Sequence, residues 1–304
     1  MARLVALTGA TGFIGNALTA LLLQRGMNVR ALVRSDAAAE RLQSTGAEVV
    51  RGDIFSSTAL AELVSGSDCV VHAAGVVRGN DQASFTNTNC EGTRCLITAM
   101  KERAPQSRLL LVSSLAAREP QLSWYAHSKR EAEQLLQESS LDWCILRPPA
   151  VYGPGDKEMR AIFDWMSRGI APVPGSEEAR TSLIHVDDLV QGMLACIESP
   201  GASGRLLYLD DGKTGGYDWR EMATIAGSVF GRQVRLLHPP AALLNAIAAI
   251  NLKFGRLLDR PAMLTPPKLR ELRHENWVVD NQEIREATGW EPAIGLHQGL
   301  SRLD

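Results

Sequence analysis

The chain has 304 residues, of which 45% are hydrophobic and 22% charged, a composition typical of an ordinary soluble globular protein. Its 32 Lys and Arg against 34 Asp and Glu leave a net charge of −2, so no positive excess points to nucleic acid or an acidic membrane as partner. The five scattered cysteines form no C-x-x-C pair and no cluster with histidine, which predicts no metal site and a reducing compartment. The N-terminal apolar run is too short for a signal peptide or a membrane span, so we expect a cytoplasmic protein.

The first half of the chain alternates short β-type runs with helical stretches. Strands are predicted at 3–9, 28–34, 47–53, 68–75, 107–114 and 141–148. Helices are predicted at 13–26, 56–66, 83–103 and 124–138. This alternation favours an α/β fold with a Rossmann-type, doubly wound parallel sheet covered by helices on both faces.

The second half predicts a smaller mixed C-terminal substrate domain. Glycine and proline density rises after Pro148, as expected of loops over the carboxyl ends of the strands, where ligands bind. We expect a dinucleotide-binding domain over 1–175, to which 180–200 return. Residues 201–304 then form most of the substrate-binding domain, with a contribution from the loop 149–180.

Two further helices are expected in this tail, near Tyr217–Phe230 and Ala241–Leu258. The second contains the longest apolar run of the chain, "AALLNAIAAI". We interpret it as a buried or cleft-lining helix, and docking on a membrane surface is the alternative.

The stretch "TGATGFIG" follows the first strand directly and opens a helix. This context is the one that a dinucleotide-binding glycine loop requires, because the tight turn lets backbone amides at a helix N-terminus face a pyrophosphate. The predicted cofactor-binding residues in this loop are Gly9, Thr11, Gly12, Phe13, Ile14 and Gly15.

The end of the second strand should meet the adenosine ribose of the cofactor. An acidic residue there would favour NAD(H), but the sequence has Arg34 at that position, followed by Ser35 and Asp36. The forked guanidinium donors of an arginine suit a 2′-phosphate, so NADP(H) is favoured. Two alternatives stay open: Asp36 takes the ribose and the cofactor is NAD(H), or Arg34 is a solvated surface charge.

Two more turns are expected to touch the cofactor. Asp53 and Ile54 in "GDI", after the third strand, offer a carboxylate to the adenine amino group. Ala73, Ala74 and Gly75 in "HAAG" form a small-residue turn beneath the cofactor. We interpret His72, at the start of this motif, as a packed histidine.

Together these motifs resemble the extended short-chain dehydrogenase/reductase superfamily, in particular its NAD-dependent epimerase/dehydratase-like members. The resemblance covers nearly the whole chain and includes "TGATGFIG", "GDI", "HAAG", "NCEGT", "LLLVSS", "YAHSK", "RPPAVYGPGD" and "IHVDDL" in a fixed order. It implies the fold and an NAD(P)-dependent enzyme activity, and says little about the substrate.

The resemblance also implies a catalytic set of Ser114, Tyr125 and Lys129. The chemistry of these residues agrees, because positions four apart share one helix face, so the Lys129 ammonium can approach the Tyr125 hydroxyl and lower its pKa. Tyr125 would then act as general acid or base toward a carbonyl or an alcohol, and Ser114 would hydrogen-bond the same oxygen. Tyr152 is a rival tyrosine, but no lysine follows it one turn later.

Other residues match positions of secondary importance in the superfamily. Ser113 is expected to touch the cofactor or the backbone, and the backbone of Pro148 to pass near the nicotinamide carboxamide. Asn89 would support the helix and water geometry. Arg147, which precedes Pro148, could equally well have only a structural role, as one partner of an ion pair.

Two departures from the superfamily pattern narrow the chemistry. Only the ten residues "LAAREPQLSW" stand between Ser114 and Tyr125, so the longer hexose-gripping loop of sugar-nucleotide members is absent. Those members also place an arginine three residues before the Ile of "IHVDD", where this chain has Thr181. Arg180 lies one position away, and a shift of one residue in an extended segment turns the side chain to the other face.

These observations favour an NADP(H)-dependent oxidoreductase that interconverts a carbonyl and an alcohol on a small, non-nucleotide molecule, with Tyr125 as general acid/base. The first alternative is a nucleotide-sugar epimerase or dehydratase with tightly bound NAD. A second alternative is a non-catalytic dinucleotide-binding module. The resemblance further suggests a homodimer, since such relatives often pair through the helices after the fourth and fifth strands.

Overall fold

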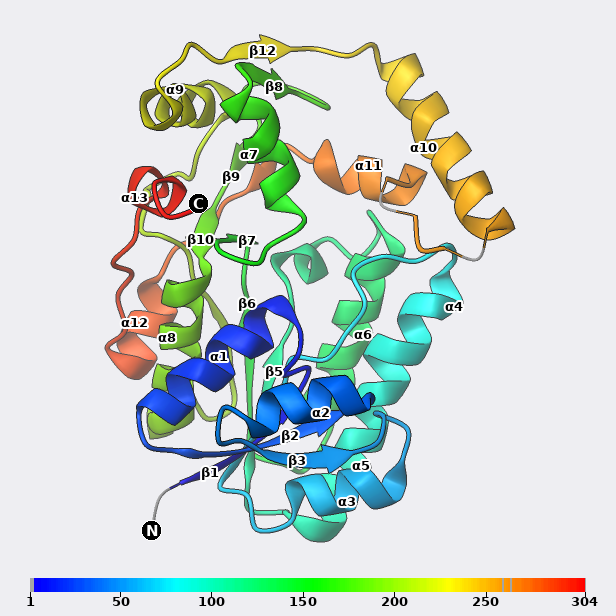
Figure 1. Ribbon diagram of the computed structural model, residues 1–304, viewed down its shortest axis with the longest axis vertical. Coiled ribbons are helices and arrows are strands. Elements are labelled where there is room, and N and C mark those ends of the chain that lie inside the picture. The colour runs from blue at the N-terminus through cyan, green and yellow to red at the C-terminus, as the bar shows by residue number, and fades with distance from the viewer. Residues whose placement is uncertain (1–2, 259, 263, 304) are drawn as a thin grey trace.

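The computed structural model describes residues 3–258, 260–262 and 264–303. Its centre is a seven-stranded sheet in the order β11-β6-β5-β4-β1-β2-β3, in which every neighbouring pair is parallel (Figure 1). The strands are β1 (Leu4–Thr8), β2 (Asn28–Val33), β3 (Glu48–Arg51), β4 (Cys69–His72), β5 (Arg108–Val112), β6 (Trp143–Arg147) and β11 (Arg205–Tyr208). The strand order reverses between β1 and β4, and ligands of such sheets bind outside the carboxyl ends of the strands at this point.

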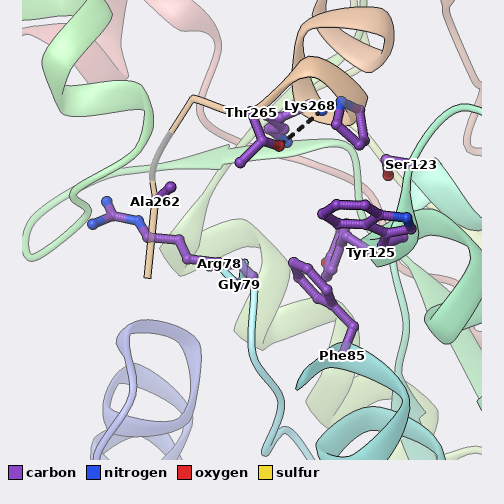
Figure 2. Close-up of a pocket in the computed structure, with 11 residues that line it drawn as sticks. Arg78, Gly79, Phe85, Ser123, Tyr125, Ala262, Thr265 and Lys268 are labelled. Atoms are coloured by element: carbon purple, nitrogen blue, oxygen red, sulfur yellow. Dashed lines mark hydrogen bonds between the residues drawn. The ribbon is translucent and has the colours of Figure 1, made fainter. Parts of the chain in front are cut away.

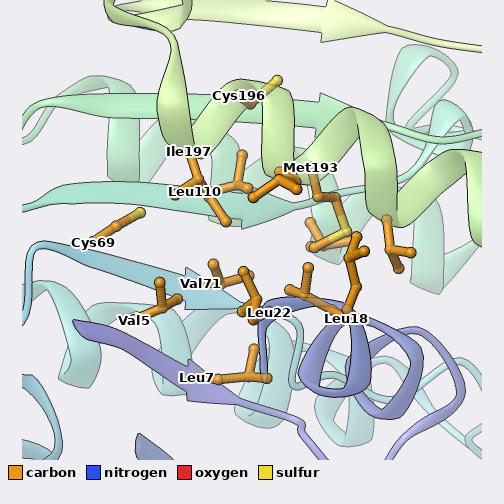
Figure 3. Packing of buried hydrophobic residues seen from close by; sticks show 14 of the residues in the cluster. Val5, Leu7, Leu18, Leu22, Cys69, Val71, Leu110, Met193, Cys196 and Ile197 are labelled. Carbon is orange, nitrogen blue, oxygen red and sulfur yellow. The ribbon is translucent and has the colours of Figure 1, made fainter. Parts of the chain in front are cut away.

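Helices cover both faces of the sheet, so the predicted doubly wound α/β fold is confirmed. One face carries α1 (Phe13–Gln24), α2 (Asp36–Gln43), α8 (Val186–Glu198) and α12 (Gln282–Thr288). The other carries α3 (Ser57–Val64), α5 (Gly92–Arg103) and α6 (Trp124–Gln137). Figure 3 shows the first of these layers, where Leu18 and Leu22 of α1 pack with Val71 of β4 and Met193 of α8. Strands buried on both faces need near-continuous apolar runs, which the sequence supplies.

The helical region after β4 is continuous, but it is not one regular helix. It consists of α4 (Gln82–Phe85), a π-helical turn η1 (Thr86–Glu91) and α5. The sequence predicted the span 83–103 correctly and missed the π turn, which hydrophobic periodicity does not reveal. The prediction also missed α2, whose N-cap Ser35 accepts a hydrogen bond from the Ala38 amide.

A second group of elements lies beyond the carboxyl ends of the strands. Three short parallel strand pairs occur there, β7 (Ala150–Tyr152) with β10 (Leu183–His185), β8 (Ile170–Pro172) with β12 (Arg235–Leu237), and β9 (Arg180–Thr181) with β13 (Asn276–Trp277). The helices of this group are α7 (Met159–Ser167), α9 (Trp219–Phe230), α10 (Ala241–Leu257), α11 (Pro266–Leu272) and α13 (Leu296–Leu300). The short 3₁₀ turns are η2 (Leu115–Arg118) and η3 (Pro200–Ala202). A separate apolar core joins α7, α9 and α13 around Tyr152.

The chain crosses between the two groups more often than the predicted boundaries imply. Helix α8 returns to the sheet, as expected for 180–200. Strand β11 and helix α12 also join the sheet layer, although they lie within 201–304. Helix α7, within 149–180, packs in the second core.

The expectation that Ala241–Leu258 is buried is wrong. Of the residues in α10, only Ala248 and Gly255 are buried. Phe254 is 55% exposed and Leu257 is 74% exposed, and Figure 1 shows α10 at the outer edge of the second group. Within the described residues, no helix combines the length and the apolar character needed to cross a membrane.

Candidate active site

The glycine loop joins β1 to α1 at the point where the strand order reverses. Gly9 has φ +79°, and a Cβ there would lie 2.6 Å from the backbone of Ala73, so a side chain is excluded. A Cβ at Gly15 would lie 2.1 Å from the Gly9 carbonyl oxygen, so the first turn of α1 packs directly on the loop. Gly12 caps α1 without a side-chain hydrogen bond, which leaves the first amides of the helix free for an anion.

The rest of the predicted loop residues surround these amides. Thr11 is exposed, and Phe13 and Ile14 are half-buried at the first turn of α1. Ala73 and Ala74 line the loop from β4, where the Thr8 hydroxyl accepts from the Ala74 amide at 3.3 Å. The structure therefore brings the glycine loop and the "HAAG" turn together.

Arg34 lies directly after β2 and is exposed. Its neighbour Asp36 forms an ion pair with Arg51 at the end of β3. Ser35 is occupied as the N-cap of α2. Within the described part of the chain, the Arg34 guanidinium has no ion pair or hydrogen bond of its own. The Asp36 carboxylate, which could accept a hydrogen bond from a ribose hydroxyl, is thus already paired with Arg51. The Arg34 guanidinium, in contrast, is available to a ligand.

The two remaining residues of the expected adenine side follow β3. Asp53 is exposed, and its carboxylate accepts from the Phe55 amide at 2.9 Å. Ile54 is buried against Gly92 of α5. His72 is packed as expected, between the hydroxyls of Thr8 at 2.6 Å and Thr93 at 3.0 Å. Burial lowers the pKa of His72 to about 3, so this imidazole is neutral.

Ser114, Tyr125 and Lys129 lie together at the carboxyl edge of β5. Ser123 begins α6 as its N-cap, which places Tyr125 in the first turn and Lys129 one turn later on the same face. Ser114 follows β5 and caps the η2 turn. The Lys129 ammonium donates to the Val112 carbonyl at 2.7 Å, and so ties α6 to β5. This hydrogen bond goes to the strand, and none joins Lys129 to the Tyr125 hydroxyl in the protein without ligands.

Burial perturbs both ionisable groups of this cluster. It raises the pKa of Tyr125 to about 12, against an opposing effect of the nearby Ser114 hydroxyl. It lowers the pKa of Lys129 to about 8, and the carboxylate of Glu133 opposes that shift. At neutral pH the tyrosine is therefore a proton carrier and the lysine a cation, and such perturbed pairs are typical of functional sites.

Asn89 lies in the π-helical turn η1 and links three elements. Its side chain accepts from the Val76 amide at 2.9 Å and donates to the Val76 carbonyl at 3.1 Å. It also donates to the Ser128 hydroxyl at 2.9 Å, in the turn between Tyr125 and Lys129. The π turn orients the side-chain amide of Asn89 so that it contacts both Val76 and Ser128, which matches the supporting role expected of Asn89.

A buried ion pair beneath the cluster involves one residue that the sequence prediction missed. Glu133, one turn beyond Lys129, forms a bidentate pair with Arg147 at the end of β6. The Ser113 hydroxyl donates to the same carboxylate at 2.5 Å. The side chain of Ser113 thus points into the protein, so only the backbone of Ser113 remains available for contact with a cofactor. Pro148 is buried, and its carbonyl accepts from the Leu115 amide at 2.8 Å, which fixes β6 beside Ser114.

A pocket opens on the Tyr125 side of the cluster (Figure 2). Phe85 meets the Tyr125 ring edge to face at 6.3 Å between centroids, and the Lys268 ammonium lies 5.9 Å from the Tyr125 ring. The remaining lining residues come from the loop after β4, the start of α6 and the segment that leads into α11, and they are Val77, Arg78, Gly79, Ser123, Trp124, Ala262, Thr265 and Pro267. The lining mixes apolar and polar groups, and includes the cations Arg78 and Lys268.

Glu271 fixes the α11 wall of this pocket and was also missed from the sequence. It is buried, accepts from the Ser123 hydroxyl at 2.7 Å and pairs with Lys268. The Glu271 carboxylate therefore joins the N-terminus of α6 to the α11 wall of the pocket. No local motif marks Glu271, because its partner is 148 positions away in the chain.

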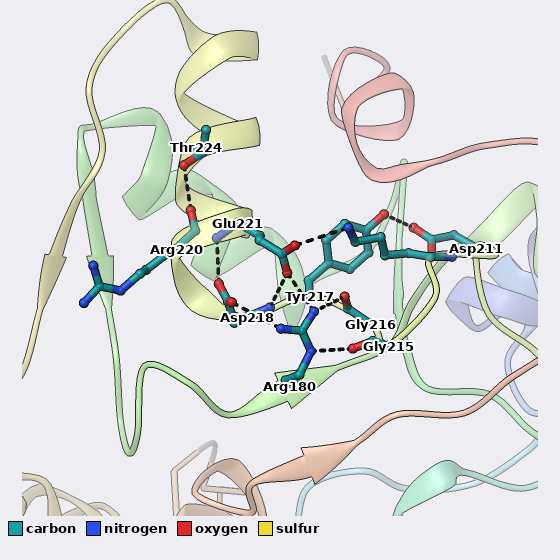
Figure 4. Close-up of polar contacts among 10 residues, drawn as sticks. Arg180, Asp211, Gly215, Gly216, Tyr217, Asp218, Arg220, Glu221 and Thr224 are labelled. Carbon is teal, nitrogen blue, oxygen red and sulfur yellow. Dashed lines mark hydrogen bonds and ion pairs between the residues drawn. The ribbon is translucent and has the colours of Figure 1, made fainter.

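Arg180 is not among the residues that line this pocket, and Figure 4 shows its guanidinium directed toward Asp218 and Glu221. Its guanidinium pairs with Asp218 at 3.3 Å and with Glu221 at 2.9 Å, and donates to two glycine carbonyls, those of Gly215 and Gly216. These carboxylates belong to the capping box of α9, so the arginine holds the second core together. Arg180, one position away from where a diphosphate would need an arginine, is therefore engaged in ion pairs.

The chain is similar to known proteins over its whole length. The profile of the "NAD dependent epimerase/dehydratase family" matches residues 5–207. A protein named ceramide reductase, from Caulobacter vibrioides, is 36% identical over 299 residues, which cover 98% of this chain and 92% of that protein. A farnesyl-dihydroquinoline-oxide ketoreductase from Stigmatella aurantiaca is 27% identical, covering 97% of this chain and 94% of its own.

Solved structures support the same fold. The UDP-glucuronic acid 4-epimerase of Bacillus cereus, in complex with NAD and a UDP-sugar, has a TM-score of 0.77 at 19% identity, and the match covers 99% of this chain and 97% of that one. The chain therefore belongs to the NAD-dependent epimerase/dehydratase family, within the extended short-chain dehydrogenase/reductase superfamily, and is an NAD(P)-dependent enzyme.

Proposed function

We propose that this enzyme is an NADP(H)-dependent carbonyl reductase whose substrate is an apolar, lipid-like ketone. The observation that carries the proposal is the cluster of Ser114, Tyr125 and Lys129, in which Tyr125 lines a pocket and Lys129 is tied to β5. The chain shares an enzyme family with epimerases as well, so the reaction and the cofactor preference both need support from the site itself.

The residues of the glycine loop fit a dinucleotide. The uncapped first amides of α1, after Gly12, and the excluded side chains at Gly9 and Gly15 make a close-fitting cradle for a pyrophosphate. A bound nicotinamide dinucleotide supplies the hydride that reduces the substrate. Side chains of the protein carry out the other steps, which are the polarisation of the carbonyl and the transfer of the proton.

In the direction of reduction, Ser114 donates a hydrogen bond to the carbonyl oxygen and polarises it. Tyr125 then delivers its phenolic proton to that oxygen as negative charge develops there. With a pKa of about 12, Tyr125 carries this proton at neutral pH. The Lys129 ammonium stabilises the phenolate that remains, and its bond to the Val112 carbonyl keeps it buried and oriented until the substrate binds.

The preference for NADP(H) rests on Arg34. A 2′-phosphate at the end of β2 would meet an open guanidinium, whereas the nearest carboxylate, Asp36, is paired with Arg51. A ribose 2′-hydroxyl would lack the acidic acceptor that NAD(H) enzymes commonly offer.

A non-nucleotide substrate is supported by three observations. Arg180 is held by Asp218 and Glu221 and so is engaged away from any diphosphate. The pocket beside Tyr125 is bordered by the aromatic rings of Phe85 and Trp124. Two relatives bear the names ceramide reductase and farnesyl-quinoline ketoreductase, and both names denote molecules with long hydrocarbon groups.

The test is cofactor oxidation by the purified enzyme with a ketoceramide and with short water-soluble ketones. We expect oxidation of NADPH in preference to NADH, and loss of turnover in Tyr125→Phe. Copurified NAD together with interconversion of UDP-sugars would overturn the proposal and support the epimerase alternative.

A further inference from the structure

Helix α10 carries an apolar stripe that faces away from the protein. Seven of the eleven large hydrophobic side chains that the described residues expose lie between Leu237 and Leu258. Within α10 they recur at helical spacing, which puts them on one face, and they are Leu243, Ile247, Ile250, Phe254 and Leu257. An apolar patch of this continuity marks an interaction site rather than scattered surface residues.

The opposite face of α10 fixes the orientation of this stripe. Ala248 and Gly255 are buried against the protein, and polar links hold both halves of the helix. Arg273 donates to the Asn245 side chain at 3.0 Å, and Arg256 donates to the Asn80 carbonyl at 3.1 Å. The helix therefore cannot rotate its apolar stripe inward without losing these contacts.

The stretch of chain that carries the stripe is positively charged. The stretch from Gly231 to Leu258 contains four Lys and Arg residues and no Asp or Glu, in a chain whose net charge is −2. Two of the four, Lys253 and Arg256, are exposed on α10 itself. A second copy of the chain would bring the cations of this stretch face to face, whereas an anionic lipid surface is complementary.

The C-terminal end of α10 lies near the pocket. The Asn80 side chain donates to the Arg260 carbonyl at 3.0 Å and accepts from the Ala262 amide at 3.0 Å, just after α10. Ala262 lines the pocket beside Tyr125. A surface that covers α10 therefore lies next to the pocket mouth.

We infer that α10 docks on the surface of an anionic lipid bilayer, with its axis in the plane of the interface and its apolar stripe among the acyl chains. Lys253, which is exposed on the flank of the stripe, then meets the lipid headgroups. Docking at this place lets a membrane-borne ketone enter the pocket without crossing water. This last link rests on the proposed function, while the docking itself does not.

The test is flotation of the full-length protein with vesicles of phosphatidylcholine containing phosphatidylglycerol, compared with phosphatidylcholine alone. Ile250→Asp combined with Phe254→Asp changes two residues that are 53% and 55% exposed, so the fold keeps its core contacts. Trp165→Asp, at a residue that is 47% exposed on α7, is the matched control. Lys253→Gln tests the electrostatic part.

We expect wild type and the control to float with the anionic vesicles. The double variant should partition at least tenfold less, and Lys253→Gln roughly fivefold less. Failure of wild type to float, or equal flotation of the double variant, overturns the inference. A wild-type dimer in light scattering that the double variant dissociates, without vesicle binding, overturns it in favour of a second copy.

Activity assays separate this inference from the proposed function. The double variant should reduce a water-soluble ketone at the wild-type rate and a vesicle-borne ketolipid more slowly. Equal rates on the vesicle-borne ketone overturn the docking inference. Flotation of wild type without reduction of either ketone leaves docking supported and refutes the carbonyl reductase.

Discussion

The carboxylate of Glu133 accepts two hydrogen bonds from the Arg147 guanidinium, at 2.8 Å from Nε and 2.5 Å from Nη2. Both side chains are buried, at 0% and 3% exposure. The pair joins α6, which carries Tyr125 and Lys129, to the end of β6. This buried ion pair therefore holds α6, with its two candidate site residues, against the end of β6. Removing one partner of the pair should lower the free energy of unfolding substantially.

Glu133→Gln should destabilise the protein by about 3 kcal/mol, because it leaves the buried Arg147 cation without its counter-charge. Chemical denaturation measures the free energy of unfolding directly. Glu138→Gln, at an exposed position at the end of the same helix, is the control and should change this free energy little. A loss equal to that of the control would mean that the pair contributes no net stability.

Tyr125→Phe removes the proposed proton donor and keeps the ring that packs against Phe85. We expect kcat for ketone reduction to fall by roughly a hundredfold or more, with cofactor affinity unchanged. Steady-state kinetics and calorimetric titration with NADPH measure the two quantities. The matched control is Tyr152→Phe in the second core, and turnover there should persist. Wild-type kcat in Tyr125→Phe would exclude this tyrosine as the acid.

The pH profile of reduction should follow Lys129. Its pKa of about 8 means that the ammonium is charged below that pH and neutral above it, while Tyr125 stays protonated through the same range. Since the cation stabilises the developing phenolate, kcat should fall as the pH rises through about 8. Measuring kcat from about pH 6 to about pH 10 tests this expectation. A profile that rises over this interval would contradict the assigned roles.

Arg34→Ala should raise KM for NADPH roughly tenfold to a hundredfold and leave KM for NADH nearly unchanged, because a charge-assisted hydrogen bond to the 2′-phosphate is lost. Arg41→Ala, on the exposed side of α2, removes the same charge nearby and serves as the control. If both variants behave alike, the effect is general electrostatics and Arg34 does not select the cofactor.

Gly15→Ala should abolish dinucleotide binding or unfold the loop, because its Cβ would lie 2.1 Å from the Gly9 carbonyl. Calorimetry with NADPH, with thermal unfolding alongside, distinguishes the two results. A Cβ at Gly295, in contrast, would meet no atom within 4 Å, so Gly295→Ala should be silent. Normal cofactor affinity in Gly15→Ala would show that the loop can move aside.

The local sequence patterns were sufficient for six of the seven strands of the sheet and for the cluster at its edge, but not for β11. Alternating β and helical periods predict a doubly wound fold, and a glycine triplet after a strand predicts the anion-binding turn. Tyr125 and Lys129 are four positions apart on one helix, so their common face follows from helix geometry alone. Each of these inferences depends only on residues close together in the chain.

Contacts between distant residues were decided by the tertiary structure alone. Glu133 with Arg147 and Glu271 with Ser123 meet because α6 packs on β6 and beneath α11, and no local motif encodes either meeting. The apolar composition of α10 predicted burial, but composition does not say which way a stripe faces. The small residues Ala248 and Gly255 allow close approach on one side, so the larger apolar side chains point outward. Whether a side chain is buried depends on the residues that pack against it, and only the folded chain brings those residues together.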